Sequence, residues 1–448
     1  MNITDQFLRG IVRLAEQPVL PAARHHACRC LLDYLGATLA GSRLIGDQLS
    51  RLLNALGEGA PTASMIGMNR RSSMTHAALI NGIASHAAEL DDGVISGIIH
   101  PGGPVFTSLL AVAQHHESRG EDFLRGVVVG YEAAVKLAEA VQPHHKLRGW
   151  HATATCGAVG AAVGIMVMRS AESKALKNAF SAAVVSAGGS LKVLQGDSHL
   201  KPFNPGHASV SAITAMALAE AGFEGPDDPL GGPSGFLEMM AGSWNEATLT
   251  SESSAPIAVE RVYFKPHAAC RYCHPAIDAA LELRAVPGFD GRRIRSIRVR
   301  TYQLAVAGHD HVAPESVSSA KMSIPFSVAV ALLRGRAGID EYTEETIRDV
   351  LVISLARLVE VSADDGHTAV FPAQTPARVD LTLDDGSILT AEVREPKGDP
   401  GAPLSDEEVD DKFLSLARFA GLEPDRASAL RDAARQFDEH AADLYQLL

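Results

Sequence analysis

Aromatic side chains, cysteines and long apolar runs are all scarce in this chain of 448 residues. Aromatic residues make up 5% of it, and this scarcity, together with abundant Ala, Gly and Leu, favours closely packed helices over a β-sandwich. The apolar stretches, such as 157–168, are too short to span a membrane, and the N-terminus lacks the pattern of a signal peptide. We therefore expect no membrane interaction, a cytoplasmic location and five reduced thiols.

Basic runs and nucleotide-binding motifs are also missing. The net charge is −13, and no cluster of Lys and Arg offers the basic face that a nucleic-acid partner would need. The sequence contains no dinucleotide fingerprint, P-loop, H-E-x-x-H motif or nucleophile elbow. These absences leave acid–base chemistry by side chains alone, without nucleic acid and without a cofactor.

The first part of the chain has the pattern of consecutive helices. Apolar residues recur at helical spacing, and the breaks between these segments are rich in Gly and Pro, as at 100–104 and 225–235. We predict an all-helical domain over residues 1–256. Its helices are expected at 22–39, 75–88, 105–116, 123–140, 153–168, 172–185 and 208–221.

The pattern changes after residue 256. Residues 296–301 alternate between polar and apolar, as a half-exposed strand does, and 378–393 indicates a hairpin because Asp385-Gly386 suits a tight turn. Helices are expected at 275–284, 323–333 and 343–358, so residues 257–403 form an α+β domain. A capping box at Ser405 and Glu408 begins a helical C-terminus. The fold class is therefore mainly α with a smaller α+β domain.

Ionisable residues gather beside helix breakers in four segments, which lie around His100, His151, Lys201 and Lys265. Backbone N–H groups and the helix dipole favour anions at such places, and imidazoles or amines there can hold carboxylates and exchange protons. A single histidine in this setting is more often a capping or core residue. Four segments that each combine ionisable residues with helix breakers indicate a site for an anionic substrate.

One segment also matches metal and haem patterns. Cys270-Arg-Tyr-Cys273-His274 fits covalent haem attachment, but that modification occurs outside the cytoplasm. Zinc would need two further ligands, and the pair Cys28 and Cys30 is badly spaced. An iron–sulfur cluster would need Cys156 to join Cys270 and Cys273. We predict ordinary thiols and no metal.

The four segments resemble the MmgE/PrpD family, whose members include 2-methylcitrate dehydratase, cis-aconitate decarboxylase and iminodisuccinate epimerase. The resemblance runs nearly end to end, and it rests on the order and spacing of its motifs together. These motifs are Asn81–His86, Leu90–Asp92, His100-Pro101, Gly130–Glu132, Gly149–His151 with Thr155 and Gly157, Lys201-Pro202, Gly206–Ala208, Lys265-Pro266, Cys270–Tyr272 and His274–Asp278.

The resemblance implies that residues 404–448 complete the helical domain and that residues 257–403 are inserted into it. It also implies a homodimer and an active site in the cleft between the domains. By position, His100, His151 and Lys201 match residues that line the family's site, while Lys265 and Cys270 match the loop facing them.

Cations are expected to bind the substrate, because removing a proton next to a carboxylate builds up negative charge that fixed positive charges stabilise. Arg148, Lys265 and Arg271 are the candidates for holding the carboxylates, Arg being suited to bidentate contact. Further candidate contacts of the substrate are Cys270, Tyr272 and His274.

The acid–base groups are expected in the first three segments. Lys201 is the candidate base, provided that flanking cations and burial favour its neutral form. His151 or His100 would protonate a departing hydroxide or return a proton to the opposite face. Asp91 or Asp92 would orient an imidazole, or would serve only as a salt-bridge residue.

Two departures from the family bear on the reaction. Decarboxylase members carry Asp and Thr where this chain has Glu89 and Gly93, and His where it has Cys270. These differences favour dehydration or epimerisation. The number of cations favours a 2-methylcitrate dehydratase-like lyase acting on a small di- or tricarboxylic acid, with an iminodisuccinate-type epimerase as the alternative. A non-catalytic helical binding protein is the remaining alternative, and it would scatter the four segments over its surface.

Overall fold

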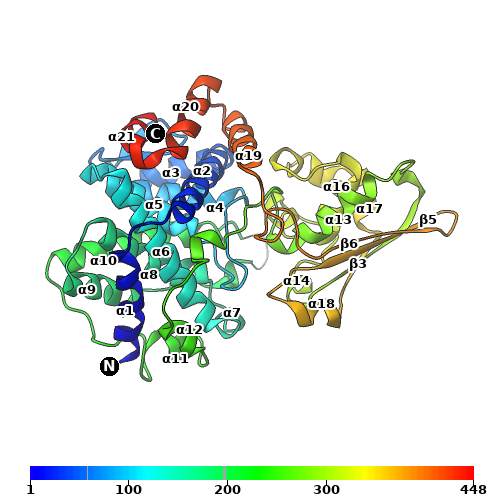
Figure 1. Cartoon of the computed structure of the whole chain (residues 1–448). Coiled ribbons are helices and arrows are strands. Elements are labelled where there is room, and N and C mark those ends of the chain that lie inside the picture. The colour runs from blue at the N-terminus through cyan, green and yellow to red at the C-terminus, as the bar shows by residue number, and fades with distance from the viewer. Residues whose placement is uncertain (58, 195–197) are drawn as a thin grey trace. The chain divides into compact units, whose positions relative to one another are not determined.

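The chain forms two compact units in a computed structural model that describes residues 1–57, 59–194 and 198–448 (Figure 1). The first unit combines Met1–Tyr263 with Ser405–Leu448, and the second is Phe264–Leu404. The units therefore divide at 263/264 and 404/405. The domain boundaries predicted from the sequence are 256/257 and 403/404.

The first unit is built from helices. Its central helix, α8, is rich in Ala and Gly and is buried on all sides, as an apolar helix without a polar face must be. The α-helices of this unit are α1 (Ile3–Glu16), α2 (Pro21–Leu44), α3 (Gly46–Leu56), α4 (Met74–Ala87), α5 (Gly102–His116), α6 (Gly120–Val141), α7 (His144–Leu147), α8 (Ala152–Met168), α9 (Ser173–Val185), α10 (Phe203–Glu220), α11 (Phe236–Met240), α12 (Glu246–Thr250), α19 (Asp406–Phe419), α20 (Pro424–Arg435) and α21 (Phe437–Leu447).

Small residues let α8 pack closely against α6. A Cβ atom at Gly160 of α8 would lie 2.4 Å from the carbonyl oxygen of Gly130 in α6. The two backbones thus touch without intervening side chains, which explains why so much Gly and Ala is placed in these segments.

A short β-hairpin is the exception to the predicted all-helical character of residues 1–256. Strands β1 (Ala63–Met65) and β2 (Arg70–Ser72) pair antiparallel between α3 and α4. Each has only three residues, too few for the alternation by which a strand is recognised in sequence.

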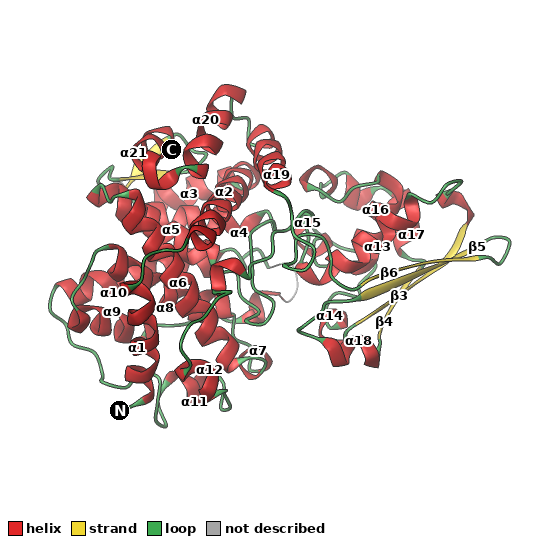
Figure 2. Ribbon diagram, viewed as in Figure 1, coloured by secondary structure: helices red, strands yellow, loops and turns green. Residues whose placement is uncertain are grey.

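The second unit holds a four-stranded mixed sheet in the order β4-β3-β5-β6 (Figure 2). Strand β3 (Ile294–Thr301) pairs parallel with β4 (Val359–Ala363) and antiparallel with β5 (Ala377–Leu383), which forms a hairpin with β6 (Ile388–Val393). Gly386 lies in the turn with φ +84°, as the Asp-Gly signal predicts.

Helices pack against this sheet. Helix α13 (His274–Arg284) lies against β5 and β6, and α16 (Ile324–Arg334) packs against α13 and β4. The other helices of the unit are α14 (Gln303–Val306), α15 (Val317–Ala320), α17 (Val350–Ala356) and α18 (Asp365–Val370).

The single helix predicted at 343–358 is interrupted in the structure. A 3₁₀ turn at Thr346–Arg348 ends where the Asp349 side chain accepts a hydrogen bond from the Leu351 N–H, and this cap begins the short helix α17. The mainly helical fold with a smaller α+β part is confirmed. Among the described residues, no helix is both long enough and apolar enough to cross a bilayer.

Candidate active site

The connection between α4 and α5 carries four ionisable residues, Glu89, Asp91, Asp92 and His100. Helix α4 ends at Ala87, and Glu89 then takes a left-handed conformation with φ +57°. This conformation is uncommon for a residue other than Gly, and it re-aims the chain after the helix. At the far end, the Asp92 carboxylate accepts a hydrogen bond from the Gly102 N–H at the start of α5. The connection is thus held to both helices that it joins.

His100 lies in this connection with its ring fixed in one orientation. Its Nδ1 donates to the backbone carbonyl of Asp92 at 2.6 Å, and its backbone N–H donates to the Thr153 hydroxyl at 3.1 Å. Because Nδ1 carries the proton, Nε2 of the neutral ring carries the lone pair.

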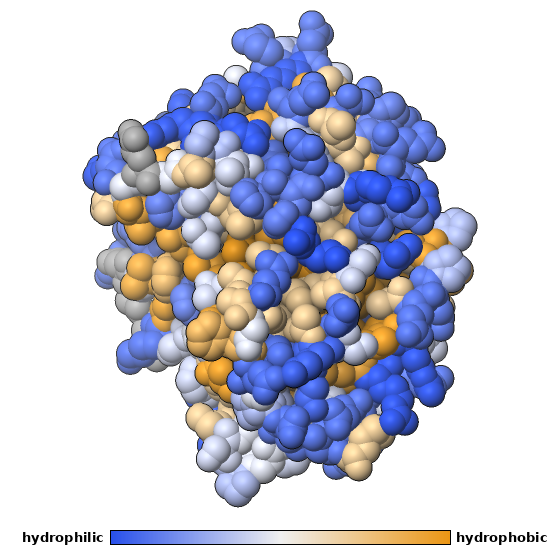
Figure 3. Space-filling view, turned by 90° about the vertical axis from the view of Figure 1, so that its left-hand side faces the viewer, coloured by the Kyte–Doolittle hydropathy of each residue, from blue (hydrophilic) through white to orange (hydrophobic). Residues whose placement is uncertain are grey.

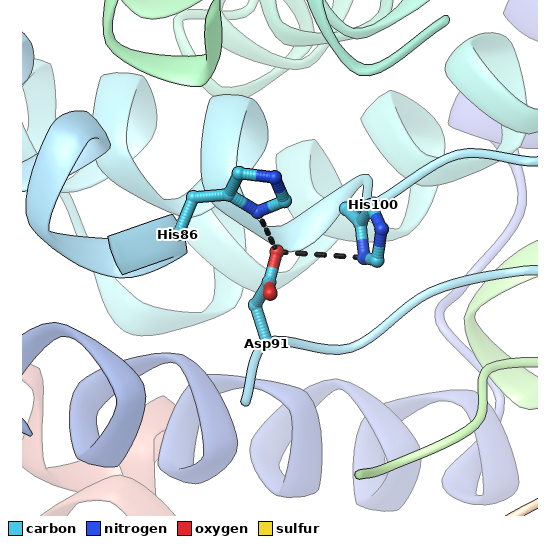
Figure 4. A group of neighbouring side chains, drawn as sticks. All are labelled: His86, Asp91 and His100. Atoms are coloured by element: carbon cyan, nitrogen blue, oxygen red, sulfur yellow. Dashed lines mark hydrogen bonds and ion pairs between the residues drawn. The ribbon is translucent and has the colours of Figure 1, made fainter. Parts of the chain in front are cut away.

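His86, in the last turn of α4, forms a buried pair with Asp91. Its Nδ1 lies 2.6 Å from Asp91 Oδ2, and the same oxygen lies 3.4 Å from Nδ1 of His100 (Figure 4). The two rings have centroids 5.0 Å apart. The Asp91 carboxylate therefore lies between two imidazoles.

These three side chains bring possible metal-donor atoms within 4.8 Å of one another. However, Nδ1 of His86 is bonded to Asp91 and Nδ1 of His100 to the Asp92 carbonyl. These hydrogen bonds account for the arrangement, and we treat the three side chains as an acid–base group.

His151 packs beside this group from the N-terminus of α8. Its ring centroid is 5.9 Å from that of His86, and its Nδ1 accepts a hydrogen bond from the Asn204 amide at 2.9 Å. Burial, with the neighbouring His86, Lys201 and His100, lowers the pKa of His151 well below its usual value. The ring is therefore neutral, with its proton on Nε2.

Lys201 lies just before α10 and forms an ion pair with the buried Glu89. The structure thus gives Lys201 an anion as its partner, whereas the predicted base role assumed flanking cations. The ion pair places the Lys201 side chain near His151, and its role as the base remains a prediction.

Asp92 differs from Asp91 in what its carboxyl group contacts. Tyr131 donates its hydroxyl to Asp92 at 2.7 Å, and the Gly102 N–H donates at 3.1 Å. Burial is the main cause that raises the pKa of Asp92 to about 8, and the nearby Asp33 adds to it. Asp92 orients His100 through its backbone carbonyl, while its side chain caps α5.

Arg148 is placed differently from the other candidates of the first unit. It is exposed at the end of α7, where its guanidinium lies against Gly242. Its role as a carboxylate ligand remains a prediction.

The second unit contains the other candidate residues. Lys265 is fully buried, Cys270 is partly exposed, and Tyr272 packs its ring against Tyr302 and His309. Burial raises the pKa of the Tyr272 phenol. The part these three residues play toward a substrate stays a prediction.

Arg271 and His274 are engaged in structural bonds within the second unit. Arg271 pairs with Asp399 at 2.5 Å and donates to the carbonyls of Pro396 and Lys397. It also donates to Nδ1 of His274, whose Nε2 bonds to the Ala269 carbonyl. Burial and the Arg271 charge lower the pKa of His274 well below its usual value. These bonds join loop 396–399 to the start of α13, and substrate contact by either residue remains a prediction.

The five cysteines considered for a metal or haem site form no disulfide in the structure. They are Cys28, Cys30, Cys156, Cys270 and Cys273. Burial raises the pKa of Cys156 to about 12, so this thiol is a protonated core residue.

Comparison with known proteins gives the family. Residues 7–247 match the MmgE/PrpD N-terminal domain, and residues 267–439 match the MmgE/PrpD C-terminal domain. The chain belongs to the MmgE/PrpD family. The match to the C-terminal domain extends beyond the second unit into α19–α21, which pack in the first unit.

Its curated relatives include proteins named as decarboxylases. The cis-aconitate decarboxylase-like protein oryM of Aspergillus oryzae is 26% identical over 100% of this chain and 96% of its own length. The cis-aconitate decarboxylases of Homo sapiens and Mus musculus are 24% and 25% identical, each over 93% of this chain and over 88% and 87% of their own lengths.

The structure adds three residues that the sequence analysis did not assign to the site: His86, Glu89 and Asn204. His86 lies in the last turn of α4, where a lone polar residue is usually interpreted as part of the packing, and Asn204 is an uncharged residue in the first turn of α10. The sequence could have indicated His86 and Glu89 as site residues, because they precede Asp91 by five and two residues at the end of a predicted helix.

Proposed function

We propose that this protein is a cofactor-free lyase that removes a proton next to a carboxylate of a small di- or tricarboxylic acid. The convergence of His100, His151 and Lys201 carries the proposal. These residues come from separate segments, yet they gather in one largely buried group with His86 and Glu89. Burying charged and polar groups is unfavourable, so a binding scaffold without chemistry would gain nothing from it.

The tautomers of the two imidazoles suggest separate roles. His100, with its lone pair on Nε2, is the base that takes the proton from the carbon next to the carboxylate. His151, with its proton on Nε2, is the acid that protonates the departing hydroxide as water. Lys201 supplies positive charge as the carboxylate takes on its dianionic form. His100 takes the proton, and the electron pair of the C–H bond forms the carbon–carbon double bond. The electron pair of the C–O bond leaves with the hydroxyl group, which takes a proton from His151 and departs as water.

Dehydration of a hydroxy acid, as by 2-methylcitrate dehydratase, is the reaction that we propose first. The names of the relatives support decarboxylation of an unsaturated tricarboxylate as the second candidate. Glu89 and Cys270, at positions where decarboxylase members are expected to carry Asp and His, favour the first. An epimerase of the iminodisuccinate type would share the initial proton removal and return the proton to the opposite face.

Proton NMR of the products tests the proposal. The purified protein is incubated with citrate, methylcitrate, aconitate, malate, tartrate and iminodisuccinate isomers, beside the variants His100→Gln and His151→Gln. His440→Gln is the matched control, because the His440 side chain on α21 is 44% exposed and pairs with Asp443, away from the site residues. We expect one acid to be converted at a rate that falls by about 10²- to 10⁴-fold in both site variants and is unchanged in the control.

The product then distinguishes the reactions. An alkene with loss of hydroxyl identifies dehydration, release of carbon dioxide identifies decarboxylation, and an inverted stereocentre identifies epimerisation. Equal conversion by the wild type and both site variants would overturn the assigned roles. Absence of conversion with every acid, although the acids bind equally to wild type and variants, would support a binding protein instead.

A further inference from the structure

His86 has no assigned role so far, although its ring is fully buried beside both acid–base imidazoles. Its Nδ1 is bonded to Asp91, and within the described ranges its Nε2 has no hydrogen-bond partner. Leaving a buried polar atom unsatisfied costs free energy, so such a group calls for a functional reason. We therefore expect the His86 ring to act on the site through its hydrogen bond to Asp91.

We propose that His86 is a positioning residue that keeps His100 in its neutral, proton-accepting form by holding the Asp91 carboxylate. This inference rests on the proposed function, in which His100 is the base. It concerns what His86 does to His100 through Asp91.

The distances indicate a competition for one carboxylate oxygen. Asp91 Oδ2 lies 2.6 Å from Nδ1 of His86 and 3.4 Å from Nδ1 of His100. His100 instead makes its 2.6 Å bond with the uncharged carbonyl of Asp92. A carboxylate at hydrogen-bond distance stabilises an imidazolium far more than a carbonyl does. While His86 binds Asp91, the carboxylate stays 3.4 Å from Nδ1 of His100 and stabilises its imidazolium less than a hydrogen bond would.

Other charged and titratable groups also face this pair, and their positions do not change with His86. The Asp92 carboxyl group is bonded to Tyr131 and the start of α5, and the Lys201–Glu89 ion pair lies on the side of His151. The ring of Tyr263 lies 6.3 Å from that of His100. A change confined to His86 should therefore act on His100 mainly through Asp91.

Three substitutions separate this role from simple packing. In His86→Asn, the amide nitrogen takes the place of Nδ1 and can still donate to Asp91. In His86→Leu and His86→Gln that donor is lost or misplaced, so Asp91 is expected to bond to His100 instead. The double variant His86→Leu with Asp91→Asn removes the carboxylate as well, and it should cancel the effect.

The test is an NMR titration of the imidazole Cε1–H signals in the ¹³C-labelled full chain. The His100 signal is identified by its loss in His100→Gln. We expect the titration midpoint of His100 to rise by about one pH unit or more in His86→Leu and His86→Gln. It should stay near the wild-type value in His86→Asn and in the double variant. An unchanged midpoint in the folded Leu and Gln variants, or an equal rise in the Asn variant, would overturn the inference.

This titration needs no substrate, so its outcome is independent of the product assay. If the protein converts no acid but the midpoint moves as expected, the proposed function fails and the coupling stands. If conversion depends on His100 but the midpoint does not move, the proposed function stands and this role of His86 fails. Where both hold, the acid limb of kcat/KM moves to higher pH in His86→Leu together with the NMR midpoint.

Discussion

Asp92 illustrates at the residue scale how burial changes the chemistry of one side chain. Burial raises its pKa to about 8, and Asp33 acts in the same direction, although bonds from Tyr131 and Gly102 oppose the shift. In the unfolded chain the same carboxyl group has its ordinary value of 3.8. Between these two values the folded protein therefore holds a proton that the unfolded chain has lost.

The sign of the pH dependence follows. Because the folded state binds the extra proton, the contribution of Asp92 to stability is complete below about pH 4 and is lost as the pH rises through about 8. Asp92→Asn should remove this decline. In urea unfolding at pH 5, 6.5, 8 and 9, we expect the free energy of unfolding of the variant, relative to wild type, to increase with pH up to pH 8 and then level off. The upper limit is about 1.4 kcal/mol per pH unit. Parallel curves for the two proteins would contradict the account of Asp92.

The residues that the sequence identifies and those that it misses differ in their local setting. His100, His151 and Lys201 stand beside Gly and Pro at helix breaks, where an ionisable side chain is conspicuous. His86 lies within α4 among small residues, and only tertiary packing brings it to the site. Asn204 stands at the same Gly- and Pro-rich break as Lys201, but its amide carries no charge and is inconspicuous there. Arg271 and His274 look equally conspicuous in sequence, yet their bonds join loop 396–399 to the start of α13.

At the scale of elements, the close approach of α4 and α10 positions the site. A Cβ atom at Gly82 of α4 would lie 2.5 Å from the Cα atom of Gly206 in α10. Helix α4 carries His86 in its last turn, and α10 carries Asn204 in its first. The contact between the two glycines therefore sets the distance between the helices that bear these side chains.

Gly82→Ala should push the two helices apart. We expect it to reduce the free energy of unfolding by about 1–3 kcal/mol, the usual cost of overpacking, and to slow substrate conversion. Gly46→Ala is the matched control because an added Cβ there meets no atom within 4 Å, and it should change stability by less than about 0.5 kcal/mol. Thermal or urea unfolding of both variants measures the difference. An equal effect of the two substitutions would show that the close approach is not required.

Most helices can be predicted from the sequence, because apolar residues recur at helical spacing between Gly- and Pro-rich breaks. Helix α8, for example, is expected at 153–168 and spans Ala152–Met168. The strands that escape prediction are short: β1 and β2 have three residues each, and β4 has five. Such strands are defined by their partners, as β4 is by its parallel pairing with β3. Helix α3, with 11 residues, is also not among the predicted helices.

At the scale of the whole molecule, the C-terminal segment returns to support the site connection. Lys412 of α19 pairs with the buried Asp33 of α2 at 2.5 Å and donates to the Leu90 carbonyl at 2.7 Å. Leu90 lies between Glu89 and Asp91. A residue more than 320 positions away in sequence thus holds the chain where the acid–base groups begin, and no local sequence pattern could reveal this contact.

Lys412→Met should destabilise the protein strongly, because it removes the cation from a buried carboxylate. We expect a loss of about 3–5 kcal/mol in the free energy of unfolding. Lys174→Met is the control, since Lys174 pairs with Glu224 on the surface, and there the loss should be much smaller. Chemical denaturation of both variants decides between a supporting and an incidental role for Lys412. A small effect in both would contradict the supporting role.

The surface of the molecule bears on the predicted homodimer. Figure 3 shows a band of apolar residues crossing one face between hydrophilic areas. Exposed apolar side chains of the chain include Val185, Phe203 and Phe223. Patches of this kind often mark contacts between proteins. Light scattering after size exclusion should give twice the chain mass of 47.3 kDa, and a single chain mass at micromolar concentration would count against the dimer.

Removal of the proton next to a carboxylate is the central claim, and its exchange with solvent tests that claim most directly. The substrate found in the product assay, or its product, is incubated with the enzyme in D₂O, and deuterium at that carbon is followed by NMR before equilibrium is reached. We predict that the wild type and His440→Gln incorporate deuterium at this one position and that His100→Gln is slower by about 10²-fold or more. Formation of the acid from its product without any deuterium at that carbon, or incorporation that is equally fast in His100→Gln, would contradict the account.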